Sequence, residues 1–256
     1  MDKENLILTH SFPTNSIILQ GLIEYLSDYF NVYFIDLPGF TEDVPPLSDV
    51  NFKTLSTFFA DKVHEFNLDN YYVGGISFGF IIVNDVEYDK RCKAIFAIEP
   101  FLGPKSLNDP AVKRYLALLC LKLICGLNLH NTIWESDLVR RIVTRIQLYP
   151  SRSLEIMFDQ IDGWTFFETA KMVISDKRVH QFHDLPYVLV ANKFDQSINY
   201  NYVYEILREN VEHLLVINTS IEHYPKDLSK TYFQKNFSEQ DLIKTLDFLK
   251  DQPAKG

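Results

Sequence analysis

Short apolar runs alternate with segments of helical periodicity in the N-terminal part of the chain. The runs are continuous, which is typical of strands buried on both faces, and they cover residues 6–9, 32–35, 70–73 and 94–98. The segments between them, which show the spacing or apolar content of buried helices, lie at 16–29, 55–66 and 80–86. Strands that alternate with helices predict a parallel sheet with helices on both faces.

The pattern changes between residues 102 and 184. Strand-like runs are replaced there by successive helical stretches at 112–124, 137–148, 153–161 and 165–174. Strand-like runs return at 187–191 and 214–217, with a helix near 200–209 between them and a final helix after Ser238, whose spacing to Asp241 resembles a capping box. We therefore expect an α/β core formed by residues 1–101 and 185–256, and a helical lid inserted at 102–184.

One serine stands where a strand-like run meets a helix. Residues 75–79 read Gly-Ile-Ser-Phe-Gly, so Ser77 lies two residues from each glycine. An abrupt strand-to-helix turn leaves no room for side chains at Gly75 and Gly79, and it holds the serine in a strained backbone conformation. The N–H groups of the following helix point at the same place. Without this context the motif is more often an ordinary loop, but here Ser77 is a candidate nucleophile.

A serine hydroxyl needs a base to remove its proton and an acid to orient that base. Of the seven histidines, His223 stands in a loop between the strand-like run 214–217 and the final helix, and the others fit surface, packing or loop-shaping positions. The expected acid is Asp195, which follows the run 187–191. The alternative acid is Glu99, at the end of the run 94–98.

The oxyanion of a tetrahedral intermediate needs two hydrogen-bond donors. We expect one from the backbone N–H of Phe78 and the other from that of Phe12, in the loop at 10–13. Six further side chains are candidates for an apolar substrate pocket under the lid: Phe101, Met157, Phe158, Trp164, Phe166 and Phe167. The alternative is that most of them only pack the lid against the core.

Composition and charge narrow the function classes. The net charge of −9 argues against nucleic acid or an anionic membrane as a partner. The three cysteines fit buried reduced thiols of a cytoplasmic protein better than a metal or disulfide pattern. The N-terminus lacks the apolar core of a signal peptide, and the most apolar run, 115–127, is interrupted by Lys122 and too short to span a bilayer. We expect a soluble, cytoplasmic protein that needs no metal and no organic cofactor.

Five landmarks together resemble the α/β-hydrolase superfamily, in particular its small, lid-bearing, bacterial esterase-like members. They occur in order at 10–13, 36–39, 75–79, 195 and 223–225. The resemblance implies an open, mainly parallel sheet of about six strands, and the chain order Ser77, Asp195, His223 is that of the triad in such enzymes. Ser11 and Phe80 depart from the glycines usual in the family.

The residues and the resemblance predict a serine hydrolase that cleaves carboxylic esters of small molecules, with short to medium acyl chains, through an acyl-enzyme. Two alternatives stay open. The same triad serves carbon–carbon bond hydrolases and amidases, and a binding protein or receptor can keep the fold with little turnover. Ser11 and Phe80 are the features that leave the second alternative open, and the sequence does not determine the oligomeric state.

Overall fold

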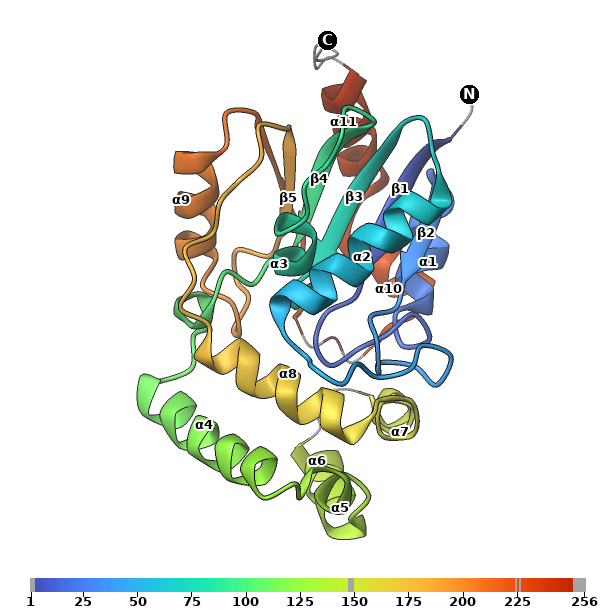
Figure 1. Cartoon of the computed structure of the whole chain (residues 1–256). Coiled ribbons are helices and arrows are strands. Elements are labelled where there is room, and N and C mark those ends of the chain that lie inside the picture. The colour runs from blue at the N-terminus through green and yellow to red at the C-terminus, as the bar shows by residue number, and fades with distance from the viewer. Residues whose placement is uncertain (1–2, 147–149, 224, 226, 251–256) are drawn as a thin grey trace.

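The computed structural model describes residues 3–146, 150–223, 225 and 227–250. Its centre is one six-stranded sheet with the order β2-β1-β3-β4-β5-β6, in which every neighbouring pair is parallel (Figure 1). The strands are β1 (Glu4–Thr9), β2 (Phe30–Ile35), β3 (Tyr71–Ile76), β4 (Cys92–Ile98), β5 (Tyr187–Ala191) and β6 (Leu214–Asn218). The prediction of a parallel sheet of about six strands is confirmed.

Helices cover both faces of this sheet (Figure 1). One apolar core lies under α2 (Phe52–Phe66), α3 (Phe78–Asn84) and α9 (Tyr200–Asn210). A second core lies under α1 (Gln20–Leu26), α10 (Lys230–Asn236) and α11 (Glu239–Lys250). The final helix, α11, begins just after Ser238, as predicted. Ser238 caps it, because its Oγ accepts a hydrogen bond of 3.2 Å from the Asp241 N–H.

Burial on both faces explains the continuous apolar runs. Successive side chains of a strand point to opposite faces, so a strand between two helical layers needs an apolar residue at every position. In β4, Ile95 and Ala97 belong to the first core, and Phe96 and Ile98 belong to the second. All residues of β3 are buried.

The register of the sheet aligns the carboxyl ends of β3, β4, β5 and β6. Ile76 of β3 pairs with Ile98 of β4, Ile98 pairs with Val190 of β5, and Ala191 pairs with Asn218 of β6. The loops that follow these strands therefore meet at one edge of the sheet, where ligands of parallel sheets bind. Every predicted catalytic residue lies in one of these loops.

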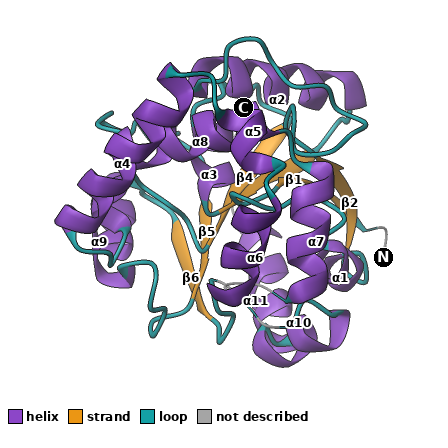
Figure 2. Ribbon diagram, turned by 90° about the horizontal axis from the view of Figure 1, so that it is seen from below, coloured by secondary structure: helices purple, strands orange, loops and turns teal. Residues whose placement is uncertain are grey.

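The described residues between β4 and β5 are mainly helical, and this segment is called the insertion below. It contains the 3₁₀ turn η1 (Pro104–Ser106) and the helices α4 (Ala111–Gly126), α5 (His130–Trp134), α6 (Asp137–Ile146), α7 (Ser151–Gln160) and α8 (Gly163–Ser175). The end of the helix predicted at 137–148 lies outside the described residues. Figures 1 and 2 show these helices stacked beyond the carboxyl edge of the sheet, with α8 nearer to the core than α4, α5 and α6.

Two sequence expectations concern the insertion and its surroundings. The expectation that the cysteines are buried is wrong for Cys120, which lies exposed on α4, whereas Cys92 and Cys125 are buried; all three thiols are free. In the described part of the chain, no helix combines the length and the apolar composition that crossing a membrane requires.

Candidate active site

Ser77 occupies a strained turn between β3 and α3. Its backbone has φ 49° and ψ −113°, a conformation that residues other than glycine rarely adopt. The two flanking glycines are sterically required, as predicted. A Cβ at Gly75 would lie 2.3 Å from the carbonyl carbon of Gly79, and a Cβ at Gly79 would lie 2.4 Å from the carbonyl oxygen of His10.

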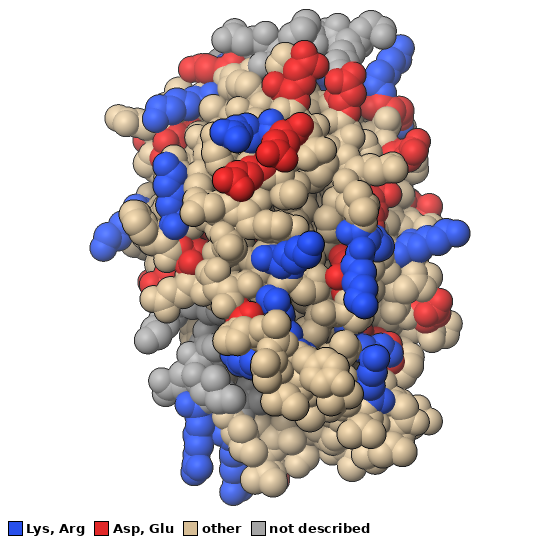
Figure 3. All heavy atoms as spheres, turned by 90° about the vertical axis from the view of Figure 1, so that its left-hand side faces the viewer, with Lys and Arg blue, Asp and Glu red and all other residues tan. Residues whose placement is uncertain are grey.

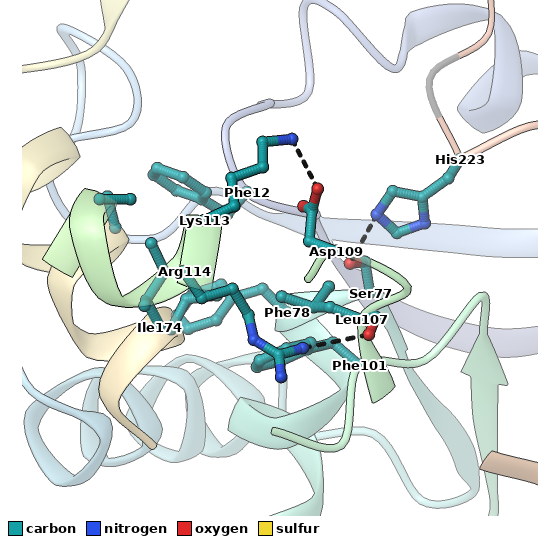
Figure 4. Close-up of a pocket in the computed structure, with 13 residues that line it drawn as sticks. Phe12, Ser77, Phe78, Phe101, Leu107, Asp109, Lys113, Arg114, Ile174 and His223 are labelled. Carbon is teal, nitrogen blue, oxygen red and sulfur yellow. Dashed lines mark hydrogen bonds and ion pairs between the residues drawn. The ribbon is translucent and has the colours of Figure 1, made fainter. Parts of the chain in front are cut away.

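The hydroxyl of Ser77 contacts the ring of His223. Ser77 Oγ lies 3.2 Å from His223 Nε2 (Figure 4), and the Ser77 side chain is almost fully buried. Burial lowers the pKa of His223 below the usual value of about 6.5, and the negative charge of Asp195 opposes this shift. A neutral imidazole can accept the serine proton, so the pair has the geometry of a nucleophile and its base.

The carboxyl group of Asp195 is hydrogen-bonded to the backbone of the loop that carries His223. Asp195 Oδ2 accepts a hydrogen bond of 2.9 Å from the His223 backbone N–H. Its other oxygen accepts from the N–H groups of Ser197, over 2.6 Å, and Ile198, over 2.7 Å. Hydrogen bonds from three backbone N–H groups thus hold this carboxyl group, which has an oxygen within 4.8 Å of a ring nitrogen of His223.

The alternative acid, Glu99, lies in the same cluster. A ring nitrogen of His223 and carboxyl oxygens of Glu99 and Asp195 all lie within 4.8 Å of one another. Glu99 is 4% exposed, has a φ of 43°, and accepts a hydrogen bond of 2.6 Å from the Asn192 N–H. Burial, with a smaller contribution from Asp195, raises the pKa of Glu99 well above its usual value. Glu99 therefore favours the neutral form, and Asp195 is the better source of negative charge.

These three residue types also occur together in metal sites. A metal ion requires deprotonated ligands with free lone pairs. Glu99 favours its protonated form here, Asp195 already accepts hydrogen bonds from three amides, and His223 Nε2 faces the serine hydroxyl. The donor set fits an acid–base cluster better than a metal centre.

The loop after β1 lies beside the turn that carries Ser77. His10 is fully buried, accepts a hydrogen bond of 2.9 Å from the Leu37 N–H at Nε2, and donates one of 2.9 Å to the Ser11 carbonyl from Nδ1. It thus shapes the loop, as the sequence suggests. Among the described backbone groups, the N–H of Phe12 and that of Phe78 donate to no carbonyl. Both residues line the cavity at Ser77, so these two amides are available to an oxyanion.

A cavity of about 210 Å³ opens beside Ser77 and His223 (Figure 4). Its walls come from the sheet edge and from α4 and α8 of the insertion, and the surrounding side chains are Phe12, Phe78, Phe101, Leu107, Asp109, Lys113, Arg114, Ala117, Ala170, Val173 and Ile174. Of the six predicted pocket residues, only Phe101 lines this cavity.

The other five candidates do not line this cavity, although the ring of Phe166 lies 5.1 Å from that of Phe12 in the cavity wall. Met157, Phe158 and Phe167 are buried in the apolar core. Three of these aromatic side chains surround Trp134. Its ring centroid lies 4.7 Å from that of Phe158, 4.2 Å from that of Phe166 and 6.1 Å from that of Phe167. Trp164 lies 5.0 Å from the ring of His130. These contacts fit the alternative that the side chains pack the insertion against the core.

Several lining residues carry no strong sequence signal. Ala170, Val173 and Ile174 share one face of α8, but the sequence does not show which face of a lid helix meets the site. Apart from Ser77 and His223, the polar part of the lining comes from the start of α4 and the residues just before it. Lys113 pairs with Asp109 over 2.5 Å, and Arg114 donates to the Leu107 carbonyl over 3.1 Å (Figure 4).

The chain resembles solved structures in its fold, but no protein-family model and no curated protein matches it by sequence. Among solved structures, MenH from S. aureus aligns over 98% of this chain and 95% of its own, with a TM-score of 0.63 and 14% identity. An enol-lactonase from Burkholderia xenovorans LB400 aligns over 98% and 93%, with a TM-score of 0.64 and 11% identity. The esterase EaEST from Exiguobacterium antarcticum also aligns over 98% and 93%, with a TM-score of 0.64 and 12% identity.

Proposed function

We propose that this chain, which has the α/β-hydrolase fold, is a serine hydrolase that cleaves carboxylic esters of small molecules. One observation carries the proposal: Ser77 Oγ lies 3.2 Å from His223 Nε2 on a strained turn that faces a cavity. A nucleophile and a base at this distance, with a carboxylate beside the base, are what acyl transfer needs.

The reaction would proceed in two halves. Ser77 Oγ attacks the ester carbonyl while His223 takes its proton, and the amides of Phe12 and Phe78 bind the oxyanion. The bond to the alcohol breaks, and His223 returns the proton to the departing oxygen. Water then attacks the acyl-enzyme with His223 as base, which releases the acid and restores Ser77. Asp195 stabilises the imidazolium formed in each half.

The cavity supports the expected acyl preference. Phe78, Phe101 and Val173 contribute apolar walls, and a volume of about 210 Å³ is small among ligand pockets. Short to medium acyl chains suit such a space. Two structural neighbours are named an enol-lactonase and an esterase and two others are epoxide hydrolases, which supports hydrolysis as the reaction class. We also propose that the protein is cytoplasmic, because reduced buried thiols such as those of Cys92 and Cys125 are typical of that compartment.

Turnover of p-nitrophenyl esters of graded acyl length tests this function. We expect hydrolysis by the wild-type chain, with a maximum at short to medium length, and loss of turnover in Ser77→Ala. The matched control is Ser175→Ala, which removes an exposed hydroxyl at the end of α8. Equal turnover in wild type and Ser77→Ala would contradict the proposal, and a single burst without turnover would favour a binding protein.

A further inference from the structure

The outward side of α4 is apolar and exposed. Its large side chains recur at spacings of three and four residues, so they share one face of the helix. This outer stripe consists of Val112, Tyr115, Leu116, Leu119 and Leu123, and the exposed fraction is 71% at Val112 and 63% at Leu123. Leu127 continues the stripe past the helix end, with an exposed fraction of 64%.

The opposite side of α4 is already occupied. Ala117 lines the cavity at Ser77, Leu121 and Ile124 pack against the apolar core, and Cys125 is buried. A helix with large apolar side chains on two opposite sides is normally covered on both, so the stripe indicates a further contact. On α6, Leu138 and Ile142 are also exposed, at 67% and 50%. Figure 1 shows α4 and α6 in the layer of the insertion farthest from the sheet.

The charges around the outer stripe are basic. Residues 111–146 contain the acidic residues Glu135 and Asp137 and six basic ones. Of these, Lys113 and Arg140 pair with Asp109 and Asp159, and Arg114 lines the cavity, which leaves Lys122, Arg141 and Arg145. Within the described residues, no carboxylate lies within 4.0 Å of Lys122, Arg141 or Arg145, and all three are exposed. In Figure 3 the lower end of the molecule shows a broad tan surface bordered by blue side chains, whereas red side chains are frequent at the upper end.

We propose that the outer stripe docks on an anionic lipid surface. An exposed apolar face with basic residues beside it buries its side chains in the headgroup region, and its cations attract acidic lipids. The net charge of −9 does not oppose this docking, because charges beyond about 10 Å are screened at ordinary ionic strength and the local charge decides.

A second copy of the chain fits the stripe less well. Pairing two α4 helices through the stripe would bring Lys122, which lies beside the stripe, toward lysines of the other copy, and α4 has no acidic residue to compensate it. Like charges brought together at an interface oppose association.

Co-sedimentation with vesicles tests the docking and does not depend on ester turnover. The wild-type chain is expected to bind vesicles that contain phosphatidylglycerol more tightly than pure phosphatidylcholine vesicles, and added salt should weaken this binding. The double variant Leu116→Glu/Leu123→Glu should bind about tenfold more weakly or not at all. The matched control Ile243→Glu, on α11 with an exposed fraction of 47%, should bind like the wild type.

Two further measurements separate the apolar and the charged contributions. Cys120 is the exposed thiol beside the stripe, whereas Cys92 and Cys125 are buried, so an environment-sensitive fluorophore can be attached there selectively. Its emission should shift to the blue on phosphatidylglycerol vesicles. Lys122→Glu/Arg141→Glu should remove the preference for acidic lipid.

Three results would overturn the proposal. The first is absence of wild-type binding to phosphatidylglycerol vesicles, and the second is equal binding by Leu116→Glu/Leu123→Glu. The third is a stable dimer in sedimentation equilibrium that the same double variant dissociates, since a second copy would then cover the stripe.

Discussion

Two carboxyl groups stand beside the histidine that contacts Ser77, and their surroundings differ. Asp195 accepts hydrogen bonds from three backbone amides, one of them the N–H of His223. Glu99 accepts one from Asn192, and burial raises its pKa well above the usual value. The local environment thus distinguishes the two acids: burial disfavours the charged form of Glu99, whereas three amides hold the carboxyl group of Asp195, as in many sites where two acids have different roles.

Substitution of each acid by its amide should separate these roles. Asp195→Asn removes the negative charge beside His223, and we expect kcat for a p-nitrophenyl ester to fall by about 10³- to 10⁴-fold. Glu99→Gln replaces a carboxyl group whose charged form is disfavoured by burial with a neutral group of the same shape, so its kcat should change by less than about tenfold. Steady-state kinetics of both variants, with melting temperatures to check folding, make the comparison. The reverse order of effects would assign the acid role to Glu99.

The pH profile of kcat/KM should follow His223. Only the neutral imidazole accepts the serine proton, so activity should fall as pH drops through the pKa of His223 in the free enzyme. Because burial lowers this pKa, the midpoint of the acidic limb is expected below about 6.5. In Asp195→Asn the opposing charge is gone, so the midpoint should move lower still. A midpoint that rises in this variant would contradict the assigned interaction.

The catalytic candidates could be predicted from sequence because each follows a recognisable strand. Ser77, Asp195 and His223 come after continuous apolar runs, and parallel strands bring their carboxyl ends to one edge. The pocket residues could not be predicted in the same way. Phe158 and Phe166 give a strong aromatic signal, but both contact Trp134 and neither lines the cavity. The sequence does not show which side of an inserted helix faces the site.

At the scale of elements, the strand-to-helix turn depends on two glycines. A Cβ at Gly75 would meet the backbone of Gly79 at 2.3 Å, and backbone atoms cannot rotate away as a flexible side chain can. The turn therefore tolerates no side chain at this position without moving Ser77.

Gly75→Ala should both destabilise the fold and abolish turnover. We expect the free energy of unfolding in urea to fall by about 2 to 4 kcal/mol, as for other overpacked core positions. The matched control is Gly126→Ala at the end of α4, where an added Cβ meets nothing within 4 Å. The control should change stability by less than about 1 kcal/mol, in the stabilising direction if at all. Equal effects of the two substitutions would refute the steric explanation.

The long helices and all six strands were predictable, and the missed elements were short. Each strand is an apolar run between two helical layers, which gives a signal that needs no knowledge of the partners. The helices α5 and α10, with five and seven residues, are too short to show a clear period. Tertiary contacts stabilise such helices, for example through Trp134 of α5, which donates to the Ile161 carbonyl over 2.8 Å.

At the scale of the whole molecule, the cavity is formed by two parts of the chain. Phe12, Phe78 and Phe101 come from the core, and Ala117 and Ala170 come from helices of the insertion. The small side chains of α4 and α8 leave space opposite Ser77. The packing of the insertion on the core therefore sets the room in this cavity.

Filling the cavity from α4 should shorten the preferred acyl chain. Ala117→Leu adds a bulky side chain to the lining, so kcat/KM for medium-chain p-nitrophenyl esters should fall by about tenfold or more, with little change for the acetate. Ala111→Leu, at an exposed position of the same helix, is the control and should leave the chain-length profile unchanged. An unchanged profile in Ala117→Leu would mean that the acyl chain binds elsewhere.

Net charge is informative only when its distribution is known. A total of −9 argues against acidic partners for the surface as a whole, but residues 111–146 are locally basic. The sequence contains these charges, and the exposed stripe on α4 becomes visible only when the helices of the insertion are placed.

Activation of Ser77 by His223 is the central claim, and reaction with a fluorophosphonate tests it most directly. The mass of the intact protein is measured after exposure of wild type, Ser77→Ala and His223→Ala to the reagent, each shown to be folded by its melting transition. We predict one adduct on the wild type and none on either variant. A folded wild-type chain that gains no adduct, or a His223→Ala chain that reacts as fast as the wild type, would contradict the account.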